Sequence, residues 1–530
     1  MRIGLDLDNT ILGYIDLFHQ LACEQNWISP DCIREKQAIK DDLARVAGDA
    51  DRGELRWQQL QAWTYGEHIS KAILFDGFIP FMKRVRREGH TLFIVSHKSE
   101  TSNYDRSVNL REHALRTLTE RGFFDELGFE KEKVFFEGTR DDKVNRINQL
   151  GLDCFIDDLP SVLTHPNFPN HTQPILFSDK PHLSLPACAS WNDITDLVTS
   201  LPHLPGNRIT RWRPFPGGNN RIREVAFVGG ERMAVKHYLT DPDDPRPRRD
   251  SEWKFLNLLW SHGFTQIPQP NHTWSDGSSM GLIEGSSPKD ISDDNLPDYL
   301  LLLRRLDEIG GQAERDQLNM AADARIRPIE WLEAVARRSA QTVEACEREG
   351  LTSISAFLTG PFESLKQTAS HTFESVCSQA DIEPDHKLPF ELWFPSPSDL
   401  GPHNTVVAGD RLVFLDFEYA GWDDPAKLLA DFLHHVAHQT PAQTRLTIIR
   451  GFVQSRERDP KLWSRLRAIA DLVALEWILI VLNVTLPHIM RRKQFAHASD
   501  RKALIQTRFE KAQLMAGAFV PFETLIEETS

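Results

Sequence analysis

Two aspartates near the start of the chain have the type and spacing for phosphoryl chemistry. Asp6 and Asp8 lie in the segment IGLDLDNT, where a short apolar run gives way to a turn. Residues two apart on an extended strand point to the same side, so both carboxylates can face one crevice. One carboxylate can attack phosphorus while the other donates and recovers a proton. The pair predicts a nucleophile and a general acid–base at the end of a strand.

Further polar groups follow at predicted strand and helix ends. Ser96 ends the apolar run TLFIVS, and Lys143 opens the helical segment DKVNRINQLG. The adjacent carboxylates Asp157 and Asp158 close the run CFIDD and are hard oxygen ligands of the kind that Mg²⁺ prefers. Ligands of a parallel α/β sheet bind outside the carboxyl ends of its strands, so we expect these groups to meet there. The nearby Lys131 and Lys133 remain alternatives to Lys143.

This ordered set resembles the haloacid dehalogenase (HAD) superfamily, whose motifs are D-x-D-x-T, a strand-terminal Ser or Thr, a Lys and an acidic pair. The resemblance covers roughly residues 1 to 200 and implies a helical cap at about 14–75 that favours small substrates. It implies that Asp6 forms an aspartyl-phosphate and that Asp8 is the general acid–base. The remaining implied roles are phosphate contacts from Thr10, Ser96 and Lys143, and Mg²⁺ ligation by Asp6, Asp157, Asp158 and the backbone carbonyl of Asp8.

A second set of candidate residues lies beyond residue 207. The turn PFPGGNN can bring backbone amides close to phosphates, although an ordinary hairpin turn has the same composition. Lys236 lies in the strand-like AVKHY, and Glu252 in the next helical segment can pair with it. Asp399, Asn404 and Asp416 supply a base for a hydroxyl and two oxygen ligands for Mg²⁺. The turn residues are Gly217, Gly218, Asn219 and Asn220.

The order of these residues resembles the protein-kinase-like fold, in particular the aminoglycoside phosphotransferase and choline kinase group. The resemblance implies that Asp399 is the catalytic base and that Asn404 and Asp416 bind the metal. It also implies ATP as phosphoryl donor, with Lys236 on its α- and β-phosphates. The segment MGLIEG, which contains Glu284, corresponds to the hinge that meets the adenine. The chain departs from the group in having Pro397 and Ser398 where His and Gly are usual, and Glu418 where Gly is common.

A helical histidine group offers a different kind of site. His434, His435 and His438 have a spacing that can imitate a metal site on one helix, but the sequence shows no further ligand for it. We therefore do not expect these three histidines to form a metal site.

The elements that must position these residues change in type near residue 205. Up to about Leu201, short apolar runs alternate with helical stretches, which predicts a parallel α/β sheet. The segment LPHLPGN, residues 201–207, breaks the pattern and is a predicted linker. A hairpin with strands at 224–228 and 233–235 follows, and after Ser251 the pattern is mostly helical. The predicted domains are 1–202, an α/β phosphatase domain, and 207–530, an α+β kinase domain with lobes at 207–285 and 286–530.

Composition limits the classes of function. The 530 residues contain 40% hydrophobic and 26% charged side chains and carry a formal charge of −15. This charge has the wrong sign for a nucleic-acid-binding protein. Six dispersed cysteines without a C-x-x-C pair indicate a reducing compartment. The apolar run near Trp477–Leu482 is flanked by charges and is predicted to be a buried helix rather than a membrane span. We expect a cytoplasmic protein without a membrane partner.

Together these patterns predict a bifunctional Mg²⁺-dependent enzyme. One module hydrolyses a small-molecule phosphate ester, and the other transfers phosphate from ATP to a hydroxyl of a sugar or amino alcohol. The alternative is a regulatory pseudoenzyme in which one module binds a nucleotide or metabolite and gates the other. The sequence predicts neither substrate and no oligomeric state.

Overall fold

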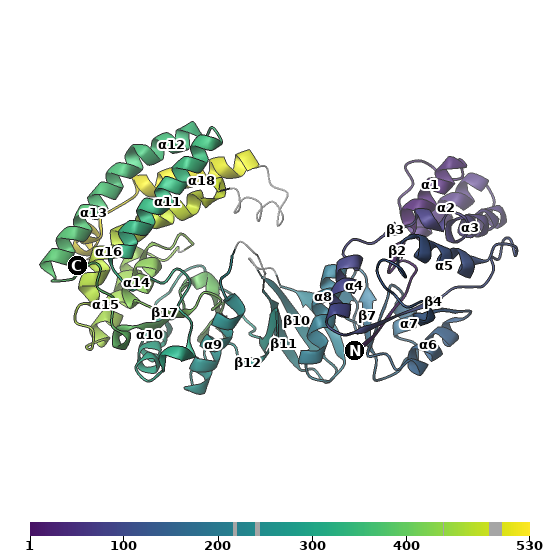
Figure 1. Cartoon of the computed structure of the whole chain (residues 1–530), viewed down its shortest axis with the longest axis horizontal. Coiled ribbons are helices and arrows are strands. Elements are labelled where there is room, and N and C mark those ends of the chain that lie inside the picture. The colour runs from purple at the N-terminus through teal and green to yellow at the C-terminus, as the bar shows by residue number, and fades with distance from the viewer. Residues whose placement is uncertain (216–219, 239–243, 438, 487–500, 530) are drawn as a thin grey trace. The chain divides into compact units, whose positions relative to one another are not determined.

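A computed structural model describes residues 1–530 except 216–219, 239–243, 438, 487–500 and 530 (Figure 1). The chain divides into two compact units, Met1–His237 and Tyr238–Ser530.

The first unit contains eleven strands and eight α-helices within its described residues. The strands are β1 (Arg2–Leu5), β2 (Leu12–Gly13), β3 (Ile73–Leu74), β4 (Thr91–His97), β5 (Val134–Glu137), β6 (Cys154–Asp157), β7 (Gln173–Phe177), β8 (Ala187–Cys188), β9 (Ile209–Pro214), β10 (Arg221–Phe227) and β11 (Arg232–His237). The helices are α1 (Ile15–Glu24), α2 (Lys36–Ala47), α3 (Ala50–Tyr65), α4 (Phe78–Arg87), α5 (Leu110–Glu120), α6 (Arg140–Gln149), α7 (Pro160–Leu163) and α8 (Trp191–Ser200), with short 3₁₀ turns η1 (Ile69–Lys71), η2 (Lys131–Lys133) and η3 (Leu201–His203).

A six-stranded sheet in the order β5-β4-β1-β6-β7-β8 forms the centre of this unit. Every neighbouring pair is parallel, as the alternation of strands and helices predicts. In the middle of the sheet, Leu5 of β1 pairs with Ile94 of β4 on one side and with Ile156 of β6 on the other. These three side chains are fully buried, because a parallel sheet is covered on both faces. The three strands therefore end at one edge of the sheet.

Helices cover both faces of the sheet. Val144 of α6 and Val162 of α7 belong to a core cluster with Leu176 of β7. The next residue along β7, Phe177, faces the other way and contacts Trp191 of α8, with ring centroids 5.7 Å apart. Phe78 of α4 also packs on Trp191. This arrangement is a doubly wound α/β sheet.

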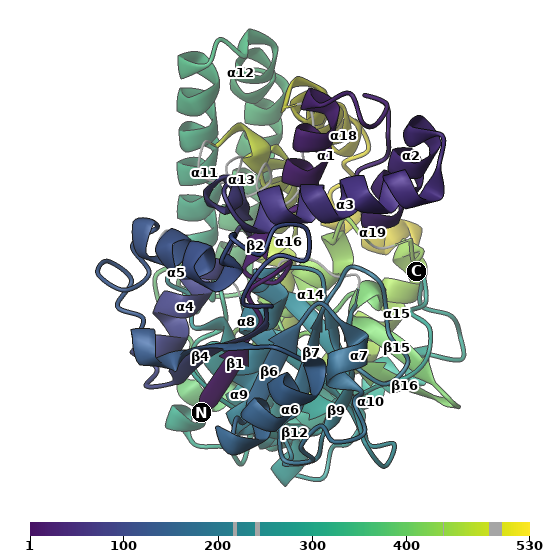
Figure 2. The same ribbon diagram turned by 90° about the vertical axis from the view of Figure 1, so that its right-hand side faces the viewer.

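A group of three helices is inserted between β2 and β3. These two short strands pair antiparallel, with Leu12 opposite Leu74. The inserted helices α1, α2 and α3 lie within the segment at about 14–75 for which a helical cap was predicted, and Figure 2 shows them together as one bundle. Gly48 ends α2 with a φ of 69°, and the Asp49 side chain accepts a hydrogen bond from the Arg52 backbone N–H at the start of α3. A left-handed glycine and an N-cap aspartate thus set the turn between two cap helices.

The boundary between the compact units differs from the predicted linker at 201–207. The antiparallel strands β9, β10 and β11 belong to the first unit, and the predicted hairpin is present with Val225 opposite Met233. Arg221 of β10 makes two hydrogen bonds of 2.6 and 2.7 Å to Asp196 of α8. Gln173 of β7 also exchanges hydrogen bonds with the backbone of Ile209. These contacts join residues on either side of 201–207 and attach β9 and β10 to the α/β unit. Local sequence patterns could not predict them, because they form between residues distant in the sequence.

The second unit is mainly helical. Its α-helices are α9 (Arg248–Ser261), α10 (Leu296–Gly310), α11 (Ile329–Arg348), α12 (Thr352–Thr359), α13 (Pro361–Gln379), α14 (Pro425–His434), α15 (Ala442–Ser455), α16 (Leu462–Leu482), α18 (Arg501–Gly517) and α19 (Phe522–Glu528). Its strands are β12 (Pro270–Thr273), β13 (Gly277–Gly281), β14 (Phe394–Ser396), β15 (Thr405–Ala408), β16 (Arg411–Phe414) and β17 (Gly421–Asp423), and its 3₁₀ turns are η4 (Arg315–Gln317), η5 (Phe390–Leu392), η6 (Pro402–Asn404) and η7 (Asn483–Thr485).

Helix α16 lies at the centre of the second unit and contacts α11, α13, α14 and α18. Among the described residues, the segment Leu462–Thr485 is long and apolar enough to cross a membrane, with a mean hydropathy of 1.9. The sequence interpretation, which considered only a shorter run, underestimated its length. However, 83% of the apolar window is buried within the protein, as expected for the core helix that the sequence predicted.

Candidate active sites

The first candidate site lies at the carboxyl ends of three adjacent strands. Asp6 directly follows β1, Ser96 lies near the end of β4, and Asp157 ends β6. The backbone N–H of Asp6 donates to the carbonyl of Ile156 at 2.9 Å, so the parallel ladder extends to the aspartate itself. Asp6 is 4% exposed, and Ser96 and Asp157 are fully buried. The sheet therefore brings three residues from separate segments of the sequence to one edge, as predicted.

Lys143 joins two of these carboxylates. The Thr139 side chain caps the start of α6, and one turn later the Lys143 ammonium donates to Asp6 Oδ1 at 2.7 Å and to Asp157 Oδ2 at 2.6 Å. Burial opposes the charge on Lys143, but the two carboxylates outweigh burial and raise its pKa. The alternative Lys133 instead pairs with Glu130, which is 61% exposed. The structure thus brings Lys143 into the acidic cluster.

Three carboxylates in this cluster are suited to a divalent cation. Asp6, Asp157 and Asp158 each place an oxygen within 4.8 Å of the others. Burial raises the pKa of Asp6 to about 7 and that of Asp158 to about 8, since a buried carboxylate resists ionisation and its neighbours are acidic. In their ionised forms, the three carboxylates carry more negative charge than one lysine can balance. A hard cation with oxygen ligands fits this excess, and Mg²⁺ is such an ion.

Two hydroxyls at the same edge lack hydrogen-bond partners among the described residues. They are the Oγ1 of Thr10 and the Oγ of Ser96, and both side chains are fully buried. A buried hydroxyl without a partner carries a desolvation cost that a ligand can remove. Phosphoryl oxygens are suitable acceptors, which agrees with the roles predicted for both residues.

Asp8 is held by two residues that the sequence interpretation missed. Lys98 Nζ lies 2.8 and 3.1 Å from the two Asp8 oxygens, and the Tyr14 hydroxyl donates to Asp8 Oδ1 at 2.7 Å. Lys98 lies two residues after Ser96, and the strand period of two was a signal for its orientation. Tyr14, at the entry to the cap, carried no comparable signal. Its pKa is raised well above the ordinary value by burial and by Asp8, so it donates as a neutral phenol.

The second candidate site is built on a hairpin in the second unit. Strands β15 and β16 pair antiparallel with Thr405 opposite Phe414, so the residues just outside this pair, Asn404 and Leu415, adjoin. The Leu415 backbone N–H donates to the Asn404 carbonyl at 2.8 Å. Asp416 follows with a φ of 62°, an uncommon conformation for a residue other than glycine. The hairpin therefore brings the two predicted metal ligands, Asn404 and Asp416, into one neighbourhood.

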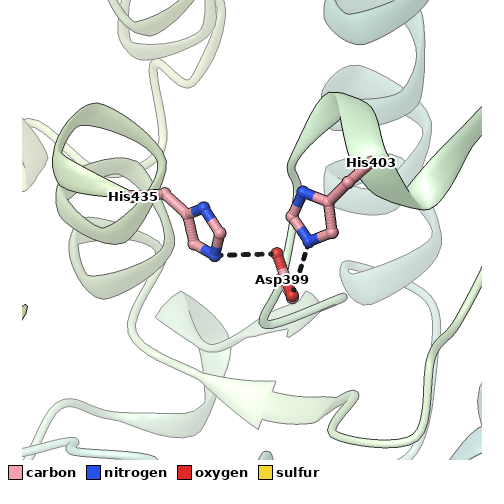
Figure 3. A group of neighbouring side chains, drawn as sticks. All are labelled: Asp399, His403 and His435. Atoms are coloured by element: carbon pink, nitrogen blue, oxygen red, sulfur yellow. Dashed lines mark hydrogen bonds and ion pairs between the residues drawn. The ribbon is translucent and has the colours of Figure 1, made fainter. Parts of the chain in front are cut away.

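Asp399 lies between two histidines (Figure 3). His403 Nε2 is 3.1 Å from Asp399 Oδ2, and His435 Nε2 is 3.5 Å from Asp399 Oδ1. Burial would raise the pKa of Asp399, but His403 and His435 outweigh burial and lower it. The hydrogen bond to Asp399 raises the pKa of His403, whereas burial lowers that of His435. Asp399 is therefore an ionised carboxylate fixed from two sides.

The sequence missed both of these histidine contacts. His403 adjoins the predicted ligand Asn404, so its position near the site could be read from the chain. His435 is the C-cap of α14 and comes from a segment more than thirty residues away. It belongs to the histidine group in which no metal site was expected from the sequence. His434 is half-buried, and burial lowers its pKa to about 3, whereas His438 lies outside the described residues.

The remaining predicted nucleotide-binding residues belong to different secondary-structure elements. Glu252 is buried in α9, where its carboxylate accepts hydrogen bonds from the Tyr238 hydroxyl at 2.6 Å and from the Phe417 backbone N–H at 3.0 Å. Lys236 is buried in β11, and its pairing with Glu252 stays a prediction. Glu284 is exposed after β13. Gly217, Gly218 and Asn219 lie outside the described residues, and Asn220 directly precedes β10.

Glu252 thereby contacts the segment that carries Asp416. The bond to the Phe417 backbone N–H fixes the residue directly after Asp416. No sequence pattern announced this contact, because it joins residues 165 positions apart.

Comparisons with known proteins give distant similarities. No protein-family model matches the sequence. A protein of Bacillus cereus described as a "Putative nucleotidase" is 24% identical over 205 residues, which are 37% of this chain and 98% of that protein.

Solved structures with similarity include small-molecule phosphotransferases. A spectinomycin phosphotransferase in complex with ADP and spectinomycin aligns with 61% of this chain and 97% of its own, at 15% identity and a TM-score of 0.42. A choline/ethanolamine kinase family protein from Mesorhizobium loti aligns with 64% of this chain and 99% of its own, at 14% identity and a TM-score of 0.38. At these levels, activity has to be inferred from the geometry of the sites.

Proposed function

We propose that the first unit is a Mg²⁺-dependent phosphatase of small phosphate esters. One observation carries the proposal: at the carboxyl ends of adjacent parallel strands, the Lys143 ammonium lies within hydrogen-bonding distance of both the Asp6 and the Asp157 carboxylates. The helices inserted between β2 and β3 support a small substrate, because a cap of this kind limits access. The partial match to the protein described as a "Putative nucleotidase" agrees with phosphate-ester chemistry.

Each residue has a definite part in this proposal. Asp6 attacks phosphorus and forms an aspartyl-phosphate, while Asp8 gives a proton to the leaving oxygen and later takes one from water. Thr10 and Ser96 donate their hydroxyl hydrogens to phosphoryl oxygens. When bound by Asp6, Asp157, Asp158 and the Asp8 carbonyl, Mg²⁺ supplies positive charge to the phosphoryl group. Lys98 and Tyr14 are positioning residues that hold the Asp8 carboxylate in a fixed orientation.

A panel of phosphorylated metabolites tests this proposal in the full-length protein. We expect phosphate release that needs Mg²⁺ and is inhibited by beryllium fluoride, which imitates a phosphoryl group on a carboxylate. Asp6→Asn should abolish both release and the acid-stable labelling of the protein by a phosphorylated substrate. The matched control is Asp142→Asn, at the exposed start of α6, which should leave release unchanged. Release that persists in Asp6→Asn would place the nucleophile elsewhere.

We infer a second activity for the chain, an ATP-dependent kinase acting on a hydroxyl of a small molecule. The supporting observation is the ionised Asp399 held beside the hairpin that carries Asn404 and Asp416. Asp399 accepts the proton of the attacking hydroxyl, and Asn404 and Asp416 hold Mg²⁺ with the nucleotide. The lowered pKa of Asp399 keeps it in the form that can accept a proton.

The departure from the usual loop sequence has a local explanation. Ser398 has a φ of 64°, and its hydroxyl donates to the Tyr419 carbonyl at 2.8 Å. A glycine adopts this conformation without strain, and here the hydrogen bond stabilises it in a serine. The change from Gly to Ser therefore keeps Asp399 in place, which favours an active kinase over a pseudoenzyme.

Nucleotide titration separates the active kinase from the regulatory alternative. Isothermal calorimetry should give ATP binding that strengthens with Mg²⁺, and Asp416→Ala should remove that metal dependence. A screen of sugar and amino-alcohol acceptors for ATP consumption then identifies the substrate. Metal-independent nucleotide binding without turnover on any acceptor would favour the pseudoenzyme. The two activities together would make the chain a bifunctional enzyme that acts at different positions of related small molecules.

A further inference from the structure

The cluster around Asp399 combines two imidazoles with a carboxylate. His403 belongs to η6, His435 caps the end of α14, and Asp399 lies in the loop after β14. One donor atom from each residue lies within 4.8 Å of the other two. Asp399 can act as the proposed base without any metal bound to His403 or His435. The ability of the three residues to bind a metal ion together is therefore not used by the proposed function.

The donor set is typical of zinc and not of magnesium. Imidazole nitrogens favour Zn²⁺, Co²⁺ and Cu²⁺, whereas Mg²⁺ prefers oxygen ligands in octahedral geometry. Two histidines, one carboxylate and an open position form a recurrent arrangement for zinc. We propose that Asp399, His403 and His435 form a binding site for a zinc-like divalent ion, separate from the proposed Mg²⁺ ligands Asn404 and Asp416.

The distances in the cluster match the edges of a tetrahedral ion site. Ligand atoms at about 2.0–2.1 Å from a tetrahedral ion stand roughly 3.3 Å apart. His403 Nε2 lies 3.1 Å from Asp399 Oδ2, and His435 Nε2 lies 3.5 Å from Asp399 Oδ1. The two distances end on different oxygens, so a rotation of the carboxylate would bring one oxygen toward both nitrogens. Both nitrogens already point at the carboxylate (Figure 3), so an ion can replace the two contacts with small movements of the side chains.

The rings are held in place but remain accessible. His435 packs edge-on against Trp477 of α16 with centroids 4.5 Å apart, and its side chain is 12% exposed. His403 stacks on His435 at a centroid distance of 4.9 Å and an interplanar angle of 17°. The side chains of His403 and Asp399 are 38% and 28% exposed, which leaves room for water as a fourth ligand. Packing therefore pre-orients the ligands for an ion that arrives from solvent.

An ion at this site would inhibit the proposed kinase. Coordination occupies the Asp399 oxygens, so the carboxylate no longer accepts a proton from the substrate hydroxyl. Zn²⁺ should therefore lower the rate of phosphoryl transfer even when Mg²⁺ is saturating. This consequence rests on the proposed kinase function, whereas the binding of the ion rests only on the geometry.

Cobalt absorption tests the binding directly in the full-length protein. Co²⁺ in a tetrahedral site with nitrogen ligands absorbs visible light intensely, whereas Co²⁺ among oxygen ligands in octahedral sites absorbs weakly. We expect a saturable intense band that Zn²⁺ abolishes and that excess Mg²⁺ leaves unchanged. His403→Ala and His435→Ala should each remove the band. His386→Ala is the matched control, because this 73% exposed histidine also lies near a carboxylate, Glu383, at 4.0 Å.

A gain-of-signal variant guards against loss by misfolding. His403→Cys should retain cobalt binding and add a near-ultraviolet charge-transfer band from the thiolate, which no unfolded variant would produce. An unchanged visible band in His435→Ala, or displacement of the band by Mg²⁺, would overturn the proposal. Kinase activity without a cobalt band would refute this site alone. A cobalt band in a protein that phosphorylates no acceptor would support the site and count against the kinase.

Discussion

Replacing Lys143 by methionine should destabilise the edge of the first sheet. The Lys143 ammonium lies 2.7 Å from Asp6 and 2.6 Å from Asp157, and the Lys143 side chain is 1% exposed. Methionine at this position would leave the two buried carboxylates without their positively charged partner. Breaking a buried pair by removing one partner costs about 3–5 kcal/mol. The exposed pair of Lys133 with Glu130 is the matched control, since such pairs contribute at most about 1 kcal/mol.

Hydrogen-exchange mass spectrometry measures this loss locally in the full-length protein. For peptides from β1 and α6, a loss of about 3–5 kcal/mol corresponds to an increase in exchange of roughly 10²- to 10⁴-fold, provided that exchange reports the opening equilibrium. Lys133→Met should change it by less than about 5-fold. Mg²⁺ should increase protection from exchange more in Lys143→Met than in the natural protein, because the cation replaces the positive charge that the variant lacks. Equal protection in the Lys143 and Lys133 variants would refute the reasoning.

Three further predictions concern other residues. Lys98→Met should lower kcat of the phosphatase by about 10- to 100-fold with little change in KM, because Asp8 loses its orienting partner; an unchanged kcat in steady-state assays would contradict this role. Asp399→Asn should lower kcat of the kinase by about 10²- to 10⁴-fold while ATP affinity, measured by calorimetry, stays the same; wild-type turnover would exclude Asp399 as the base. Burial raises the pKa of Asp471 to about 6 in the folded protein. Protonated Asp471 therefore makes its full contribution to folding stability below about pH 4, and this contribution is lost as the pH rises through 6. Asp471→Asn should therefore gain up to about 3 kcal/mol relative to the natural protein between pH 4 and pH 8 in urea denaturation, and a pH-independent difference would rule out this burial effect.

The sequence determined the strand-end residues of the first site. A parallel strand ends where its apolar run ends, and all parallel strands of a sheet end at the same edge. The positions of Asp6, Ser96 and Asp157 therefore followed from three local patterns, and so did the presence of helices between residues 14 and 75. Likewise, Asn404 and Asp416 lie close together because a short hairpin joins them, and hairpins are local structures.

The tertiary structure decided the contacts that depend on how packed elements are oriented. Tyr14 reaches Asp8 because of the path by which the chain enters the cap, and Glu252 meets the Phe417 backbone because of the packing of α9. No local pattern in the sequence indicated that His435 faces Asp399. Residues 399 and 435 come from segments with independent local patterns, and only the angle at which α14 packs brings the imidazole to the carboxylate. Local periodicity specifies the face of an element, whereas the partner of that face depends on the packing of the whole unit.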